Sequence, residues 1–196
     1  ESPTLKGLFA AGEAACWDMH GFNRLGGNSV AETVVAGMIV GEFIADFCDT
    51  AENGIDIPTS LIYGALAKEE ARLKSFMNHG GSGNAYEIRT RMQEIMTTKI
   101  GIFRKGADME SAVAELEELY KRSFKVSVKD VVGPNPELIY AYRTQKMLRV
   151  ALSVAYGALN RKESRGAHYR EDFPVRNDIE WLNRTIATWK EGDTLP

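Results

Sequence analysis

Three stretches of helical periodicity between residues 86 and 161 limit the fold of this chain more than any other feature of its sequence. They cover residues 86–101, 108–124 and 135–161, and in each of them apolar residues recur at the spacing that lines one face of an α-helix. The predicted inward-facing residues are Ile88, Met92, Ile95 and Met96, then Val113, Leu116 and Tyr120, then Leu148, Ala151, Leu152, Ala155 and Leu159. Because short polar connections join the three stretches, residues 84–162 predict an up-and-down antiparallel helical bundle.

The first part of the chain has a different pattern, in which a short apolar run and a glycine-rich loop precede a helix. Residues 7–11 predict a short buried strand that ends at Gly12. Asn28 or Ser29 can cap the next helix, and Ser29 and Glu32 stand at the spacing of the S-x-x-E capping box, in which each side chain accepts a backbone N–H at the helix start. This pattern predicts a helix over residues 29–47.

That helix contains Gly37 and Gly41. A glycine in a helix interior costs about 1 kcal/mol relative to alanine, so the two glycines indicate close packing against another backbone. A second helix is predicted over residues 59–77, and the glycine-rich run 78–84 ends it. Residues 162–196 lose the helical periodicity and predict an irregular tail. The chain is therefore expected to be mainly α.

Composition excludes several classes of function. Of the 196 residues, 44% are hydrophobic and 26% are charged, as in ordinary soluble globular proteins. The 24 basic residues are dispersed among 27 acidic ones, so the chain lacks the one-sided positive field that binding to nucleic acid requires. Cys16 and Cys48 have no metal-ligand spacing, and we expect a reducing cytosol and no metal site. The most apolar run, residues 34–40, is far shorter than the roughly 20 residues of a membrane span.

Residues 12–32 carry the chemistry, and they read GEAACWDMHGFNRLGGNSVAE. A helix N-terminus offers unpaired backbone N–H groups and about half a positive charge, which together favour an anion. Arg24 adds a permanently charged fork that suits a carboxylate, and Gly26 and Gly27 leave room for a flat ligand. Taken alone, the same pattern also fits a structural ion pair of Arg24, which is the commoner case.

Two blocks of sequence resemble the flavoprotein subunits of fumarate reductases and succinate dehydrogenases. GEAACWDMHGFNRLGGNSVAETVVAGMIVGE is similar to the segment of that family in which a Gly-Glu pair precedes an HGxNRLGxNS loop that opens a helix. RKESRGAHYREDFPVRND is similar to the C-terminal block that follows the family's helical bundle. The resemblance implies the C-terminal part of an FAD-binding domain (short strand, loop, helix) over residues 1–80. A bundle of about three helices with its tail follows over residues 81–196.

The resemblance also implies roles for single residues. Arg24 inherits the binding of a carboxylate of fumarate or succinate, and Gly27 can add a backbone contact. Glu13 inherits the binding of hydroxyl groups of FAD. Asn28, Ser29 and Val30 are expected to lie against the flavin ring. No catalytic proton donor is expected in this chain, and His20 is interpreted as a hydrogen-bonded structural residue.

The implied enzyme interconverts fumarate and succinate by hydride transfer through FAD, coupled to quinol. The sequence has no GxGxxG after a strand, so the FAD site is incomplete here. The family's flavin-linking histidine and proton-donating arginine lie upstream, and the start of the sequence also predicts that this chain begins within a longer protein. The fragment alone is therefore expected to be inactive. The implied partners are an iron-sulfur subunit and a quinone-reactive membrane anchor, at the cytoplasmic side of the inner membrane.

Several alternatives stay open. The sequences of both blocks are most similar to those of epsilon-proteobacterial quinol:fumarate reductases, and a succinate dehydrogenase flavoprotein is the alternative. Phe22 and Val30 differ from the commonest succinate dehydrogenases, and the Gly26-Gly27 pair argues against L-aspartate oxidase. The isolated chain can instead be a non-catalytic helical docking module, which we expect to self-associate through apolar residues such as Leu8 and Val34. The charged run 161–174 is interpreted as a salt-bridged docking surface that seats the bundle on the flavin domain, and not as a proton relay.

Overall fold

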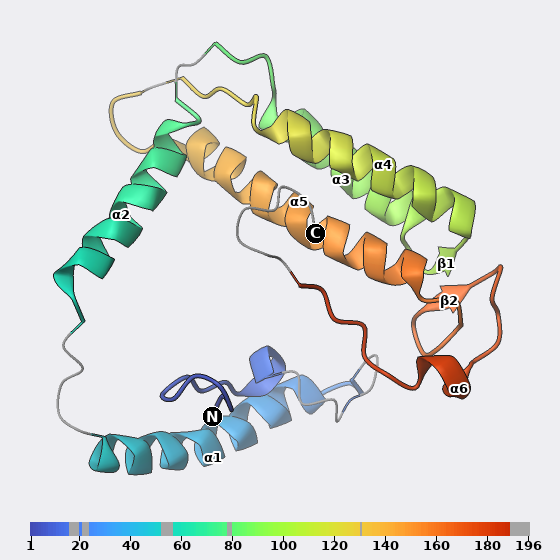
Figure 1. The fold of residues 1–196 in the computed structure, drawn as a ribbon, viewed down its shortest axis with the longest axis horizontal. Coiled ribbons are helices and arrows are strands. Elements are labelled where there is room, and N and C mark those ends of the chain that lie inside the picture. Colours follow the sequence, from blue (N-terminus) through green and yellow to red (C-terminus); the bar gives the residue numbers. More distant parts are fainter. Residues whose placement is uncertain (16–19, 21–23, 52–56, 78–79, 130, 189–196) are drawn as a thin grey trace. The chain divides into compact units, whose positions relative to one another are not determined.

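A computed structural model describes residues 1–15, 20, 24–51, 57–77, 80–129 and 131–188, and it confirms a mainly helical fold (Figure 1). The elements in chain order are η1 (Gly12–Ala15), α1 (Asn28–Thr50), α2 (Thr59–Lys74), α3 (Ala85–Lys99), β1 (Phe103–Arg104), α4 (Gly106–Ser123), α5 (Pro136–Asn160), β2 (Tyr169–Arg170) and α6 (Asp178–Trp181). Cys16 and Phe22 lie outside the described residues. Among the helices of the described residues, none has both the length and the apolar character needed to cross a bilayer.

The chain divides into two compact units, Glu1–Pro58 and Thr59–Pro196. Helix α2 groups with the second unit, where Tyr142 on α5 donates a hydrogen bond from its hydroxyl to Glu69 Oε2 at 2.8 Å. The domain boundary near residue 80 stays a prediction.

In the N-terminal unit, helix α1 is formed as predicted and extends to Asn28–Thr50, but the predicted capping box is wrong. Gly27 is the N-cap residue, with φ of 80°, and no side chain caps the helix. The Ser29 hydroxyl donates instead to Glu13 Oε1, and the Glu32 carboxylate accepts from His20. Tertiary partners therefore take both side chains that the local motif would have used.

The predicted strand over residues 7–11 is not formed. The backbone of Leu8 is used in a local turn, since Leu8 N donates to Leu5 O at 3.2 Å and Ser2 N donates to Leu8 O at 2.8 Å. A strand needs a neighbouring strand for its ladder, and no described segment pairs with this run. The backbone instead continues into the 3₁₀ turn η1.

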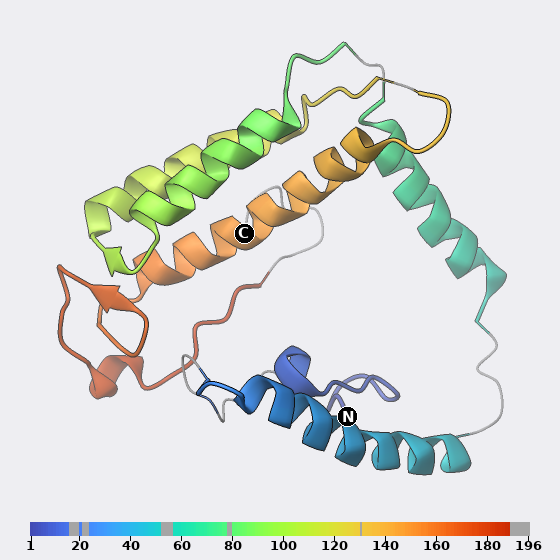
Figure 2. The same ribbon diagram turned by 180° about the vertical axis from the view of Figure 1, so that it is seen from behind.

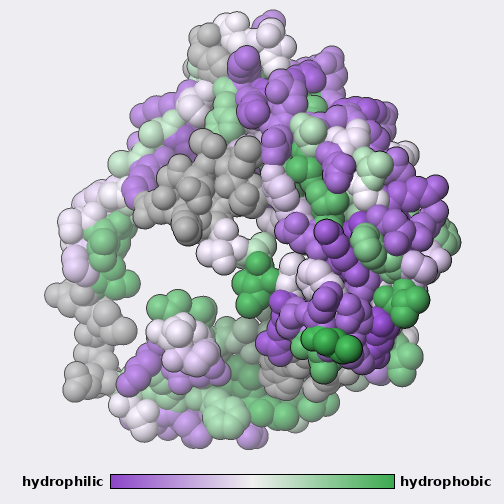
Figure 3. All heavy atoms as spheres, turned by 45° about the vertical axis from the view of Figure 1, so that its right-hand side comes forward, coloured by the Kyte–Doolittle hydropathy of each residue, from purple (hydrophilic) through white to green (hydrophobic). Residues whose placement is uncertain are grey.

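Helix α1 presents a mostly apolar surface, visible as green side chains in Figure 3. Of its 23 residues only Ala36 is buried, whereas Val34 and Met38 are exposed. No described atom beyond the helix and adjoining residues lies within 4 Å of where a Cβ at Gly37 or Gly41 would stand. The backbone partner predicted for these glycines and the self-association of the chain therefore stay predictions.

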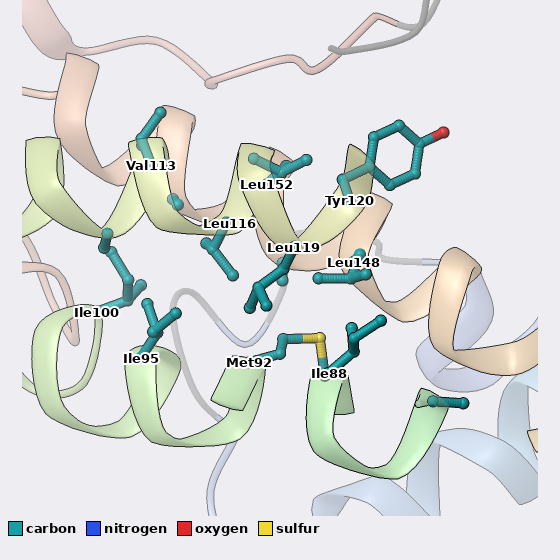
Figure 4. Close-up of a cluster of buried hydrophobic side chains, with 14 of the residues drawn as sticks. Ile88, Met92, Ile95, Ile100, Val113, Leu116, Leu119, Tyr120, Leu148 and Leu152 are labelled. Atoms are coloured by element: carbon teal, nitrogen blue, oxygen red, sulfur yellow. The ribbon is translucent and has the colours of Figure 1, made fainter. Parts of the chain in front are cut away.

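The core of the C-terminal unit is the predicted bundle of α3, α4 and α5, which pack pairwise and lie side by side in both ribbon views (Figures 1 and 2). Six residues connect α3 to α4, from Ile100 to Lys105, so these helices run antiparallel. Ten of the twelve predicted core residues are buried, and Met96 and Leu159 pack against them half-buried. Figure 4 shows side chains of all three helices pointing toward one another.

Local side chains cap two of the three bundle helices at their N-termini. The Asn84 carboxamide oxygen accepts from the backbone N–H of Tyr86 and of Glu87. The Asn135 oxygen accepts from Leu138 N at 3.2 Å, and Pro136 follows at the first helical position, where its missing N–H is no loss.

Two further helix ends, the start of α4 and the end of α5, are capped by the tail. Lys105, the N-cap residue of α4, makes no side-chain capping bond, and Asp172 Oδ2 accepts from Gly106 N at 3.0 Å instead. At the end of α5, the Arg170 guanidinium donates to the carbonyls of Leu159 at 2.9 Å and Ala158 at 3.2 Å. Arg170 also pairs with Asp172 at 2.7 Å, so one short segment fastens α4 to α5. We call Arg170 and Asp172 the tail clip.

A second ionic cluster centres on Glu163, which is fully buried. Its carboxylate accepts from Arg161 at 2.9 Å, from Arg165 at 2.8 Å and from Asn177 N at 2.8 Å. Arg165 also donates to Asp178 at 2.6 Å. Charged groups of the run 161–174 are thus paired within the C-terminal unit, and the seating of the bundle on a flavin domain stays a prediction.

His168 belongs to the same network. Arg104 Nη1 donates to His168 Nδ1 at 2.7 Å, so Nε2 carries the ring proton and donates to Arg161 O at 3.1 Å. Burial, first, and the neighbouring arginines lower the pKa of His168. Both nitrogens of this neutral ring are used in hydrogen bonds within the unit. This agrees with the interpretation of the charged run as a structural network and not as a proton relay.

We expect acid to destabilise the C-terminal unit through these carboxylates. Hydrogen bonding by Arg165, the largest cause, lowers the pKa of Glu163 from 4.5 to about 2, and bonding by Arg170 lowers the pKa of Asp172 from 3.8 to about 2. Because a lowered pKa means that the unfolded chain binds the proton more tightly, the stabilisation is complete above about pH 4.5 and is lost as the pH falls toward 2. Thermal unfolding followed by circular dichroism between pH 6 and pH 2 measures this loss.

Glu163→Gln is the control for the acid prediction. It should lower the melting temperature at pH 7 and should flatten its fall below pH 4.5, since the titrating group is gone. An equally steep acid slope in Glu163→Gln and in the unmodified chain would contradict the assignment to Glu163.

Candidate functional site

Three of the predicted site residues come together where the loop enters α1. Arg24 Nε donates to Glu13 Oε1 at 3.0 Å, and Ser29 Oγ donates to the same oxygen at 2.8 Å. The hydrogen bond from Ser29, first, and the bond and charge of Arg24 lower the pKa of Glu13. Glu13 is therefore an ionised carboxylate that holds Arg24 in place.

The outer side of Arg24 is available to a ligand. Its side chain is 40% exposed, and only Nε bonds to a described residue. The two terminal amino groups of a guanidinium present parallel N–H groups that match the two oxygens of a carboxylate. With Nε fixed by Glu13, Arg24 can grip a carboxylate by those terminal groups.

The start of α1 adds a second set of donors. No side chain caps it, and no acceptor among the described residues takes the backbone N–H of Ser29 or Val30. Such N–H groups carry the positive end of the helix dipole. Beyond the chain neighbours of Gly26 and Gly27, no described atom lies within 4 Å of where a Cβ at either position would stand, and the Val30 side chain is exposed. An anionic or flat, polar-edged ligand can therefore approach the backbone here.

His20 is also tied to α1. Its Nε2 donates to Glu32 Oε2 at 2.7 Å, and the side chain of Glu32 is only 6% exposed. The structural, hydrogen-bonded role expected for His20 agrees with this contact. Sequence reasoning missed the partner, because the spacing of Glu32 from Ser29 indicated a helix cap.

A mostly apolar hollow of about 290 Å³ lies beside this pair. Its lining residues are His20, Asn28, Ala31, Glu32, Val35, Ala36 and Ile39. The described residues contain no cluster of three or more His, Cys, Asp or Glu side chains that could hold a metal ion.

Two protein families match this chain. Residues 89–195 match the family described as "Fumarate reductase flavoprotein C-term", and residues 1–30 match the family described as "FAD binding domain". The second match includes Glu13, Arg24 and Asn28–Val30, and the first covers α4, α5 and the tail.

Individual relatives agree with the family matches. The fumarate reductase flavoprotein subunit of Helicobacter pylori (strain ATCC 700392 / 26695) is 52% identical over 190 residues, which are 96% of this chain and 26% of that protein. The succinate dehydrogenase flavoprotein subunit of Bacillus subtilis (strain 168) is 35% identical over 93% of this chain and 31% of that protein. The chain thus spans between about a quarter and a third of these relatives.

Solved structures also share the fold. A quinol-fumarate reductase with menaquinol molecules gives a TM-score of 0.79 at 39% identity, covering 91% of this chain and 31% of that one. The Mycobacterium smegmatis Sdh1 complex in the apo form gives a TM-score of 0.76 at 34% identity, and the match covers 86% of this chain and 28% of that one.

Proposed function

Because this chain belongs to the fumarate reductase flavoprotein family, we propose that it contributes the C-terminal share of an FAD-dependent active site that interconverts fumarate and succinate. The observation that carries the proposal is the Arg24 guanidinium, held by Glu13 beside the uncapped start of α1. This arrangement suits a small dicarboxylate next to a flat cofactor.

Arg24 is the proposed substrate-binding residue. Its terminal N–H groups would take one carboxylate of the dicarboxylate in two parallel charge-assisted bonds. Fixing one end of a small substrate in this way sets the position of its two central carbons, and orientation of that kind supplies much of the rate of a two-reactant step. Gly27 would add a backbone contact without a side chain in the way.

The residues at the start of α1 fit FAD. The N–H groups of Ser29 and Val30, which have no acceptor among the described residues, suit the polar edge of a flavin ring. So does the space that described atoms leave at Gly26 and Gly27, and exposed Val30 suits the apolar face of the ring. Asn28 stands at the first helical position, beside the same edge. Glu13 Oε2 makes no hydrogen bond to a described residue and can accept cofactor hydroxyls. When bound, FAD supplies hydride transfer, and the positive helix end would favour negative charge at the adjacent part of the ring.

Fumarate reduction with quinol is the proposed direction. The relatives named above include a fumarate reductase flavoprotein at 52% identity, against 35% for a succinate dehydrogenase flavoprotein. The proposed assembly contains an iron-sulfur subunit and a quinone-reactive membrane anchor, with this flavoprotein peripheral at the cytoplasmic side of the inner membrane. Succinate oxidation is the alternative direction, favoured by the likeness to the Sdh1 complex.

Turnover with fumarate tests the proposal directly. The full-length protein that contains this chain, purified with its flavin, should oxidise a reduced artificial dye when fumarate is added. Maleate, the cis isomer, places its second carboxylate in another direction and should support far less turnover. Flavin-loaded protein that turns over neither fumarate nor succinate would overturn the proposed function.

We expect Glu13→Gln to lower the flavin content of the full-length protein. The change removes the charge that strengthens hydrogen bonds to cofactor hydroxyls, and it leaves the size of the side chain almost unchanged. The expected loss is about tenfold in affinity, measured as flavin per protein after dialysis, or as the extent of flavin attachment if the bond is covalent. Glu42→Gln removes the same charge from the exposed far half of α1 and should leave flavin content unchanged. Equal flavin content in both variants would contradict the role of Glu13.

A further inference from the structure

The loop that carries Arg24 is fastened at two points. Glu13 holds Arg24 itself at 3.0 Å, and Glu32 holds His20 at 2.7 Å. The proposed substrate contact uses the first of these bonds and leaves the second without a role.

Burial of Glu32 favours the hydrogen bond between His20 and Glu32. The side chain of Glu32 is 6% exposed, and a buried carboxylate without a partner is strongly unfavourable. Since a carboxylate can only accept, the His20 ring must present its Nε2 proton to it. Glu32 lies in the second turn of α1, so this bond ties His20 to the helix.

The point where His20 is held lies close in the chain to Arg24. The two residues are four positions apart, and four residues span at most about 14 Å of chain. Glu13 fixes Nε of Arg24, but the side chain is 40% exposed and its terminal amino groups bond to no described residue. A second fixed point only four residues away, at His20, can therefore add to the constraint that Glu13 places on these groups.

We infer that His20 is a positioning residue for the dicarboxylate: through Glu32 it fixes the loop so that the outer face of Arg24 meets the substrate carboxylate. This inference rests on the proposed function and adds a residue to its substrate site. His20 does not touch the substrate in this arrangement. Its loss should therefore weaken dicarboxylate binding through Arg24 while the flavin stays bound.

Malonate separates binding from turnover. It is a dicarboxylate whose single central carbon cannot form the double bond of fumarate, so its dissociation constant, measured by calorimetry in the flavin-loaded full-length protein, reports binding alone. His20→Asn carries an amide too short to reach Glu32 from the position of Nε2, and it should weaken malonate binding about tenfold. His20→Gln places an amide N–H near the position of Nε2 and should restore binding to within about twofold.

Arg24→Ala supplies the second part of the test. If His20 acts through Arg24, adding His20→Asn to Arg24→Ala should change malonate binding and the KM for fumarate no further, because the two effects are not additive for residues that act as a unit. Full additivity of the two changes would overturn the inference. The same holds if His20→Asn lowers thermal stability or flavin content but leaves malonate affinity per flavin unchanged.

The outcomes also distinguish this inference from the proposed function. Unmodified protein that binds no malonate and turns over no dicarboxylate would overturn both. Normal turnover with unchanged malonate affinity in His20→Asn would overturn only the role of His20. If His20→Asn does not fold, Glu32→Gln decides by the same measurement: its neutral oxygen weakens the bond without changing shape, so several-fold weaker malonate binding is expected, and unchanged binding would overturn the inference.

Discussion

Arg24→Ala should lower fumarate reduction by about three orders of magnitude in the full-length protein, compared at equal flavin content. A factor of that size corresponds to about 4 kcal/mol of transition-state stabilisation, which is reasonable for two charge-assisted bonds to one carboxylate plus the orientation they provide. The assay is the fumarate-dependent oxidation of a reduced artificial dye. Such a dye bypasses the quinol, so the result does not depend on partner subunits.

Two further variants sharpen the result for Arg24. Arg24→Lys keeps the charge and loses the planar fork, so it should recover only part of the activity. Arg143→Ala removes an exposed arginine from α5 in the other unit and should leave activity unchanged. Near-normal activity of Arg24→Ala would mean that Arg24 is a structural partner of Glu13, and the site assignment would be wrong.

Arg170→Met should lower the free energy of unfolding of the C-terminal unit by about 3 kcal/mol or more. Its side chain is 2% exposed, and the guanidinium bonds to Asp172 and to carbonyls at the end of α5. Removing one partner of a buried ionic cluster leaves the others unsatisfied, which typically costs 3–5 kcal/mol. Urea unfolding of the 196-residue chain, followed by circular dichroism, measures the change.

Arg176→Met is the matched control for the tail clip. Arg176 also pairs with an aspartate, Asp178 at 2.7 Å, but its side chain is 60% exposed. Exposed pairs contribute little, so this variant should stay within about 0.5 kcal/mol of the unmodified chain. If both variants lose the same free energy of unfolding, the helix caps made by Arg170 contribute no more stability than an exposed ion pair does.

The bundle could be predicted from the sequence because its information is local. The periodicity of α3, α4 and α5 identifies their inner faces without knowledge of their neighbours. Asn84 and Asn135 are N-cap residues that mark two of the helix starts. The caps at α4 and at the end of α5 could not be predicted in this way. They come from Arg170 and Asp172, and the bond between Gly106 and Asp172 joins residues 66 positions apart.

In the candidate site, the residues could be predicted from the sequence, but their contacts could not. Arg24, Glu13 and Ser29 were each assigned from the family resemblance, but nothing in the sequence indicates that they bond to one another. The predicted cap at Ser29 and Glu32 was wrong because Glu13 and His20 compete for the same side chains. Both precede the helix in the chain, and the local pattern does not determine that they return to it.

The tail clip also bears on the lifetime of the folded unit. Contacts between residues far apart in the chain require a long loop to close, so they tend to form after the local helices have paired. Interactions absent from the folding transition state change the unfolding rate and hardly affect the folding rate. We therefore expect Arg170 and Asp172 to act as a latch: the three helices assemble about equally fast without them, but come apart sooner and meet a protease more often.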